Sequence, residues 1–272
     1  MTRPGHTGES RLAVSKPALP DHDQSDHDQS DHDQSGPRSA PRSTYGHVHA
    51  GAARRCPSDL TRACSDGDVP LPEEITRYHD ESEVIYIGAR PTGYVMRIEE
   101  PDPTWPHCYA EHADLISAVL GDRLLAIQHI GSTSVPCLPA KPIIDIDIAV
   151  ADPVDEAAYS PALTSLGLVH WLTEPGWHQH RLFKMLDEPR VHVHVFGPDC
   201  PEMVRHRMFR DWLTEHPDDR ERYADAKRSA LARVDAPGAD HGALGFGMRY
   251  NAVKEPVVRE IYARMFRAAG LL

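Results

Sequence analysis

The sequence predicts an α/β (α+β) domain, in which a sheet core with helices is followed by a helical C-terminal layer. Three observations predict it. Short β-type runs mix with helical periodicity between about residues 83 and 200, helical spacing dominates beyond residue 202, and residues 1–70 show almost no aliphatic periodicity. We therefore divide the 272 residues into a disordered, low-complexity tail, 1–82, and a folded domain, 83–272.

The composition of the tail predicts disorder. Of residues 1–70, 22 are Pro, Gly or Ser, and too little apolar surface remains to offset the entropy of ordering. The pentapeptide Asp-His-Asp-Gln-Ser occurs three times in succession, over residues 21–35. We interpret it as a repeat expansion in a disordered tail. The alternative is a weak metal-binding tract through His22, His27 and His32.

The folded part is expected to begin with two short strands and a helix. Residues 84–87 form a β-type run closed by Gly88, and residues 94–98 form a second run before an acidic, proline-containing turn. Trp105 and Pro106 then open a helix that Gly121 ends. Its apolar side chains recur at helical spacing, at Tyr109, Ala113, Ile116 and Leu120.

Four more strands and four helices are expected beyond Gly121. A strand over 124–130 is broken by Gly131, and residues 143–150 form a β-branched strand with acids inserted. Ser160 and Pro161 supply an N-cap and a first-turn proline for a helix that ends at Gly167. The remaining elements are strands over 181–186 and 191–196, and helices over 202–215, 218–234 and 249–269.

Charge and cysteine content exclude several classes of protein. Lys and Arg total 29 against 41 Asp and Glu, and a net charge of -12 makes bulk nucleic-acid binding unfavourable. Five cysteines without a CxxC pair indicate neither a disulfide framework nor a structural zinc site. No apolar run approaches the roughly 20 residues of a membrane span, and no signal-peptide core is present. A soluble, cytoplasmic protein without membrane partners is expected.

The densest chemical signal lies in residues 129–148. Gly131 and Ser132 follow an expected strand, and a short helix starting there would offer N–H groups and hydroxyls, including that of Thr133, to an anion. Asp145 and Asp147 are two apart in a β-type run, so both carboxylates share one sheet face. The isoleucines between and beside them point to the other face.

Two carboxylates this close repel each other unless a cation or hydrogen-bond donors lie between them. Mg or Mn, bridging carboxylates and substrate phosphates, is the usual resolution. The alternative is a pair of acids on a solvated strand face or capping nearby loops. The joint spacing of the Gly-Ser pair and the two acids, on consecutive strands, favours a site for a cation and phosphate groups.

Residues 129–150 closely resemble the signature of the GrpB family, a member of the DNA polymerase beta-like nucleotidyltransferase superfamily. The resemblance covers about residues 83–269 and continues in Trp105-Pro106, in 191–195 and 209–213, and in Tyr223, Lys227, Tyr250 and Lys254. It implies a nucleotidyltransferase fold, with a mixed, mainly antiparallel sheet flanked by helices. It also implies that the Gly-Ser and Asp-x-Asp motifs form the nucleotide site.

The chain departs from the family pattern in two places. Cys137 stands where the family usually has Gly, and a turn needing positive φ would be strained at Cys, so we expect either a shifted loop or an ordinary conformation at Cys137. Active nucleotidyltransferases place a third acid on a later strand, where this chain has His192 and His194. These histidines are either half-buried strand residues or replacements for the third carboxylate, which would shift metal preference from Mg towards Mn, Zn or Ni. Carboxylates beside them should raise the histidine pKa values.

Other positions carry weaker signals. Lys141 precedes Asp145 by four residues and could meet a phosphate, and Arg181 and Lys184 could add positive charge to the cleft. For Tyr223, Lys227, Phe209 and Trp212 we expect packing, whereas Arg210 either faces the cleft or pairs with an acid.

These observations support a metal-dependent nucleotidyltransferase that uses a nucleoside triphosphate and an unknown small-molecule or protein acceptor. The expected catalytic residues are Asp145, Asp147 and His194. The expected metal ligands are Asp145, Asp147, His192 and His194, and the expected nucleotide contacts are Gly131, Ser132, Thr133, Lys141 and Arg181. The alternative is an inactive nucleotide-binding or scaffold module. In some bacteria the GrpB domain is fused to dephospho-coenzyme A kinase, so a link to coenzyme A metabolism is possible for either.

Overall fold

The computed structural model describes residues 70–78, 83–87, 95–235 and 245–272. The predicted tail up to residue 69, with its pentapeptide repeat, lies outside the described residues, so its disorder stays a prediction.

A six-stranded sheet forms the centre of the described part of the chain. Its order is β1-β4-β5-β6-β3-β2; β3 and β6 are parallel and the other neighbouring pairs are antiparallel. The strands are β1 (Ile85–Tyr86), β2 (Ala126–Ile130), β3 (Ile143–Ala149), β4 (Val169–Glu174), β5 (His180–Met185) and β6 (Arg190–Phe196). The predicted mixed, mainly antiparallel sheet is confirmed.

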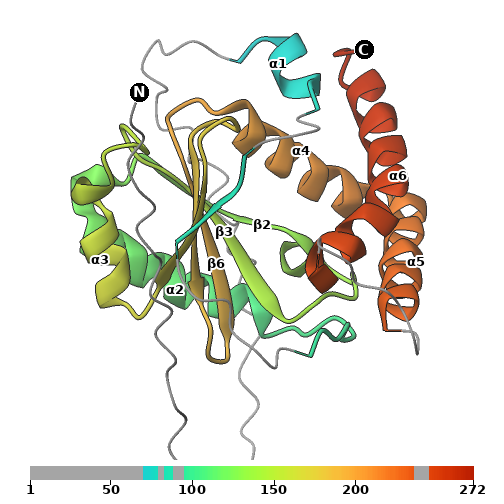
Figure 1. Cartoon of the computed structure of the whole chain (residues 1–272). Helices are drawn as coiled ribbons and strands as arrows, with labels where there is room; N and C mark the ends of the chain where they lie inside the picture. The colour runs from blue at the N-terminus through green and yellow to red at the C-terminus, as the bar shows by residue number, and fades with distance from the viewer. Residues whose placement is uncertain (1–69, 79–82, 88–94, 236–244) are drawn as a thin grey trace, which may run out of the picture. The chain divides into compact units, whose positions relative to one another are not determined.

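Helices cover both faces of this sheet. They are α1 (Pro72–Thr76), α2 (Trp105–Leu120), α3 (Ser160–Ser165), α4 (Pro201–Glu215), α5 (Pro217–Val234) and α6 (Gly245–Ala268). The helices α2 and α3 pack on one face, whereas α4 lies on the other face with α5 and α6, which run side by side (Figure 1). The predicted helical C-terminal layer is thereby confirmed. Among the described residues, no helix combines the length and apolar character that crossing a bilayer requires.

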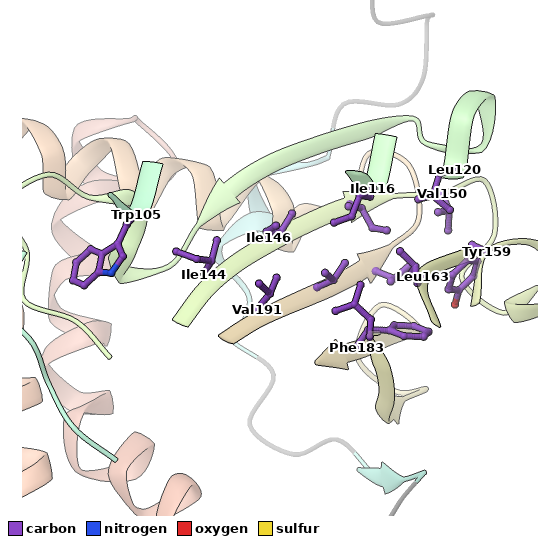
Figure 2. Close-up of a cluster of buried hydrophobic side chains, with 14 of the residues drawn as sticks. Trp105, Ile116, Leu120, Ile144, Ile146, Val150, Tyr159, Leu163, Phe183 and Val191 are labelled. Carbon is purple, nitrogen blue, oxygen red and sulfur yellow. The ribbon is translucent and has the colours of Figure 1, made fainter. Parts of the chain in front are cut away.

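The face towards α2 and α3 holds the main hydrophobic core. Ile144 and Ile146 of β3 and Val191 of β6 point to the same side as Ile116 of α2 and Leu163 of α3 (Figure 2). All five side chains are at most 2% exposed. Burying one such aliphatic side chain contributes about 1.5–3 kcal/mol. This apolar stripe is the reason that the acids between the isoleucines must point to the opposite face.

The sequence-based boundaries differ from the structure at two strands. Residues 95–98, in the predicted strand over 94–98, join no strand of the sheet; instead Glu99 forms an isolated two-way backbone bridge with Ala140. Strand β4 was missed because His170 and Trp171 obscure its alternation. It lies between β1 and β5, pairs with both, and therefore adds one strand to the sheet.

One helix lies within the range that the sequence assigns to the tail. Ile75 of α1 is 6% exposed, and Arg205 of α4 donates a hydrogen bond of 2.8 Å from Nε to the Ile75 carbonyl. Residues 70–78 therefore belong with the folded part. A single apolar side chain in a polar segment gives too weak a periodic signal to reveal this docking.

The loop between β2 and β3 contains a strained backbone conformation at Cys137. Cys137 has φ of 62°, in the left-handed region, and its side chain is exposed. A left-handed conformation costs a non-glycine residue roughly 1–2 kcal/mol. The alternative that Cys137 adopts an ordinary conformation is therefore wrong, because this residue keeps the positive φ.

Replacing Cys137 with Gly should stabilise the protein. Gly adopts this φ freely but loses more entropy on folding, so we expect a net gain of about 0.5–1 kcal/mol in the free energy of unfolding. Denaturant melts of Cys137→Gly against Cys137→Ala measure it, because Ala keeps the strain. Equal stability of the two variants would contradict this account.

Candidate active site

The parallel pairing of β3 with β6 creates the candidate site. Its register sets Asp145 opposite His192, and Asp147 opposite His194. Asp145 Oδ1 lies 3.2 Å from His192 Nδ1 and 3.9 Å from His194 Nε2. One ligand atom from each of these three residues falls within 4.8 Å of the others. Three of the four predicted metal ligands, Asp145, His192 and His194, thus lie close together.

The protonation states of Asp145 and His192 suit a cation. Burial alone would raise the pKa of Asp145, but hydrogen bonds and charge interactions with His192 and His194 outweigh it and hold the pKa below its usual range. Burial lowers the pKa of His192 to about 4, against the opposing effect of Asp145. The expectation that neighbouring carboxylates raise the histidine pKa values is therefore wrong for His192, because desolvation dominates. A charged carboxylate beside a neutral imidazole is the state that metal ligands adopt.

Asp147, also predicted as a metal ligand, lies in a different environment. Its side chain is 0% exposed, and Oδ2 accepts hydrogen bonds of 2.9 Å from Gln128 and from His206 Nδ1. The same Gln128 amide also donates to the Met203 carbonyl of α4. The structure therefore assigns Asp147 to the joint between the sheet and α4, which corrects the prediction that it stands with Asp145. Its Oδ1 is buried with no hydrogen-bond partner among the described residues.

His206 carries a positive charge between two acids. Its Nδ1 lies 2.9 Å from Asp147 Oδ2 and its Nε2 lies 3.3 Å from Glu202 Oε1. Burial would lower the pKa of His206, but the charges and hydrogen bonds of Asp147 and Glu202 raise it to about 10. The sequence analysis did not consider His206, because it comes from α4, 59 residues beyond Asp147.

A second row of side chains orients His194. His194 Nδ1 lies 3.0 Å from His180 Nε2, and His180 Nδ1 lies 2.8 Å from Glu174 Oε2. The His180 ring is 2% exposed and packs against Trp177 and Phe196. With its Nδ1 so engaged, His194 turns Nε2 towards Asp145. Such carboxylate–histidine contacts fix the ring orientation of metal-ligating histidines.

The Gly131–Ser134 turn brings the backbone against Asp145. Gly131 has φ of 71° and ψ of -171°, a combination essentially restricted to glycine. A Cβ on Gly131 would lie 2.9 Å from Asp145 Cβ and against its Oδ2. Thr133 points inward instead of into the cavity: it is 4% exposed and its hydroxyl donates to the Ile143 carbonyl. The predicted nucleotide contact of Thr133 is therefore corrected to a structural one.

A cavity of about 340 Å³ opens between the sheet and the helical layer. Its lining includes Asp145 and His194 of the sheet, the Gly131–Ser132 turn and Lys141. The rest of the lining comprises Ile130, Ile143, Trp177, His206, Tyr223, Lys227, Tyr250, Asn251 and Lys254. Lys227 is buried, as the packing interpretation expects, but it also lines the cavity.

Arg181 does not reach this cavity. It lies opposite Val195 on neighbouring strands, so its side chain shares the α3 face of the sheet, where Nε donates to Glu156 Oε1 at 2.9 Å. The prediction that Arg181 contacts a nucleotide here is therefore wrong. Arg181 directly follows His180 in β5, so the two side chains lie on opposite faces of the sheet. Lys184 does share the cavity face, but its ammonium packs 4.6 Å from the centre of the Trp171 ring.

The contacts of His206 with Asp147 and Glu202 make the free energy of unfolding depend on pH. A free imidazole has a pKa of about 6.5, and in the folded protein that of His206 rises to about 10. The folded protein therefore holds an extra proton between these values, and the stabilisation is present below about pH 6.5 and is lost as the pH rises towards 10. We expect His206→Gln to cost about 3–5 kcal/mol near pH 6 and much less near pH 10. Denaturant melts of both proteins across this range measure the difference, and a constant difference would refute the assignment.

Known proteins resemble most of the described part. A UPF0157 protein of Halalkalibacterium halodurans is 38% identical over 189 residues, which span 69% of this chain and 92% of that protein. A dephospho-CoA kinase of Mycolicibacterium paratuberculosis is 31% identical over 195 residues, and the match spans 62% of this chain but 46% of that protein. The crystal structure of the conserved protein GrpB from Enterococcus faecalis matches with a TM-score of 0.47 and 25% identity, over 61% of this chain and 99% of that one.

A family model described as GrpB protein matches residues 95–264, which include β2 to β6 and the whole cavity lining. The match covers more than half of the 272 residues. This protein therefore belongs to the GrpB family.

Proposed function

We propose that the cavity binds a nucleoside triphosphate with a divalent cation and supports nucleotidyl transfer to a small-molecule or protein acceptor. The observation that carries the proposal is the composition of one cavity. A carboxylate and an imidazole line its sheet wall, the glycine backbone turn closes one edge, and lysines and tyrosines line the helical wall. Nucleotidyl transfer requires these elements together: a cation site and contacts for a phosphate chain.

The cation is expected at Asp145, His192 and His194. Their donor atoms lie within 4.8 Å of one another, and a set of one carboxylate and two imidazoles suits Mn or Zn better than Mg. When bound, the cation would offset negative charge on the phosphoryl group that is transferred. Asp145 holds its charged carboxylate towards the site, and His180 keeps the His194 ring in a fixed orientation.

The Gly131 turn contributes by its backbone. Because a side chain there would collide with Asp145, only glycine lets the backbone pass this close to the carboxylate. Ser132 lines the cavity beside it. We propose that these two residues position a phosphate against the Asp145 side of the site.

A binding module without turnover is the second candidate, and one observation favours it. The carboxylate of Asp147 is bonded to Gln128 and His206 rather than grouped with Asp145. The triad is thus left with one carboxylate where nucleotidyltransferases generally use three acids. Such a protein would bind nucleotide and cation but would transfer nothing.

The names of some relatives suggest which acceptors to test first. The matching stretches cover 46% of the proteins named dephospho-CoA kinase, so the remainder of those proteins has no counterpart in the match. We propose that the substrates of a GrpB-type domain include intermediates of coenzyme A metabolism. Dephospho-CoA is therefore among the acceptors to test.

Turnover should depend on Asp145. We expect the full chain to release pyrophosphate from at least one of ATP, GTP, CTP and UTP when Mn and an acceptor are present, and Asp145→Asn to lose at least roughly 100-fold of that rate, because one charged ligand is removed. A coupled pyrophosphate assay measures it, and Asp114→Asn, an exposed acid on α2, serves as the control. Nucleotide binding without release would favour the binding module, whereas neither binding nor release would refute both candidates.

Cation binding should depend on the histidines. We expect His194→Ala to weaken Mn affinity by roughly 100-fold, and His180→Gln, which disturbs only the orientation of His194, by roughly 10-fold. Titration calorimetry of the apoprotein measures both without any need for activity. His112→Gln, on α2 and bonded to the Cys108 carbonyl, is the matched control. Unchanged affinity in His194→Ala and in a parallel His192→Ala variant would make these residues structural.

A further inference from the structure

Three ammonium groups gather on one side of the cavity. Lys141 comes from the loop before β3, Lys227 from α5 and Lys254 from α6, and all three line the cavity. They are three of the four lysines in the described part of the chain, the fourth being Lys184. Lys227 is 2% exposed and donates a hydrogen bond to the Pro139 carbonyl.

Two tyrosine rings hold these ammonium groups together. Lys141 lies 5.0 Å from the centre of the Tyr250 ring, and Lys227 lies 4.7 Å from that of Tyr223. Lys254 lies between the two rings, at 5.6 Å from Tyr223 and 5.8 Å from Tyr250. An aromatic face attracts a cation but carries no net charge. The rings therefore gather the lysines without neutralising them.

No carboxylate neutralises this cluster within the described residues. None of the three ammonium groups has an acidic oxygen within 4 Å there, although most described arginines are paired with acids. Asp145 is the one acid among the residues lining the cavity, and His192 and His194 already contact it. Three like charges in a confined space are unfavourable unless an anion joins them. Burial above all, and then the charges of Lys254 and Lys141, lower the pKa of Lys227 to about 6, so an anion bound in the cavity would be needed to keep this amine protonated near neutral pH.

We propose that Lys141, Lys227 and Lys254 form a binding site for a multiply charged phosphate chain, the β- and γ-phosphates of the nucleotide. The identity of that ligand rests on the proposed function, but the binding of a phosphate chain to the three lysines does not. Pyrophosphate carries several negative charges on adjacent phosphate groups and can meet three ammonium groups at once, whereas orthophosphate presents a single group. The cluster also supplies the cationic contacts that Arg181, on the other face of the sheet, does not.

Inorganic pyrophosphate is the direct probe. Titration calorimetry on the full chain in EDTA separates this site from the cation site, because no divalent metal is free. We expect pyrophosphate to bind at least 10-fold more tightly than orthophosphate. We expect Lys254→Gln and Lys227→Met to weaken pyrophosphate at least 10-fold. Lys254 is half-buried, so Lys254→Gln keeps the test decisive if Lys227→Met does not fold.

Arg228→Gln is the matched control. Arg228 follows Lys227 on α5, but its guanidinium is exposed and lies 3.3 Å from Glu100, so the same loss of charge should leave pyrophosphate affinity unchanged. No binding of pyrophosphate to the wild-type chain, or full affinity in Lys254→Gln, would overturn the proposal. Pyrophosphate binding without any turnover of nucleotides would support this site and contradict nucleotidyl transfer. Turnover of nucleotides without pyrophosphate binding in EDTA would support nucleotidyl transfer and contradict the lysine site.

Discussion

The register of the parallel pair β3–β6 is the constraint on which the site depends. It sets Asp145 against His192 and Asp147 against His194, and it holds because Ile144, Ile146 and the valines of β6 are buried together on the opposite face. A slip of one residue would move every one of these side chains to the wrong face. The hydrophobic core therefore fixes the spacing of the polar groups on the other face of the sheet.

The charged groups on the polar face fall into two sets. His206 pairs with both Asp147 and Glu202 in the joint between the sheet and α4, so removing one partner leaves a buried charge. Asp145 and the three lysines border the cavity, and the lysines have no acid partner among the described residues. The first set stabilises the fold. Under the proposed function, the second set binds ligands of opposite charge: a cation at the triad and an anion at the lysines.

The sequence predicts the features that depend on short spacings. Period-two spacing placed Asp145 and Asp147 on one face, and His192 and His194 likewise, and the structure agrees. The pairing of β5 with β6 also excludes Arg181 from the cavity, because Arg181 lies opposite the core residue Val195. The different environments of Asp147 and Asp145 could not be read in this way, because Gln128 and His206 reach Asp147 from other elements. The same holds for Lys227, since whether an α5 residue packs or lines a cavity is decided by the position of α6.

A crystal structure of the full chain grown with Mn and a non-hydrolysable nucleoside triphosphate tests the central claim most directly. The anomalous signal of Mn locates the cation independently of the protein density. We predict one peak bonded to Asp145, His192 and His194, with the phosphate chain extending from it to Lys141, Lys227 and Lys254. A peak on Asp147, or a nucleotide bound away from the lysines, would contradict the division of the charged groups described above.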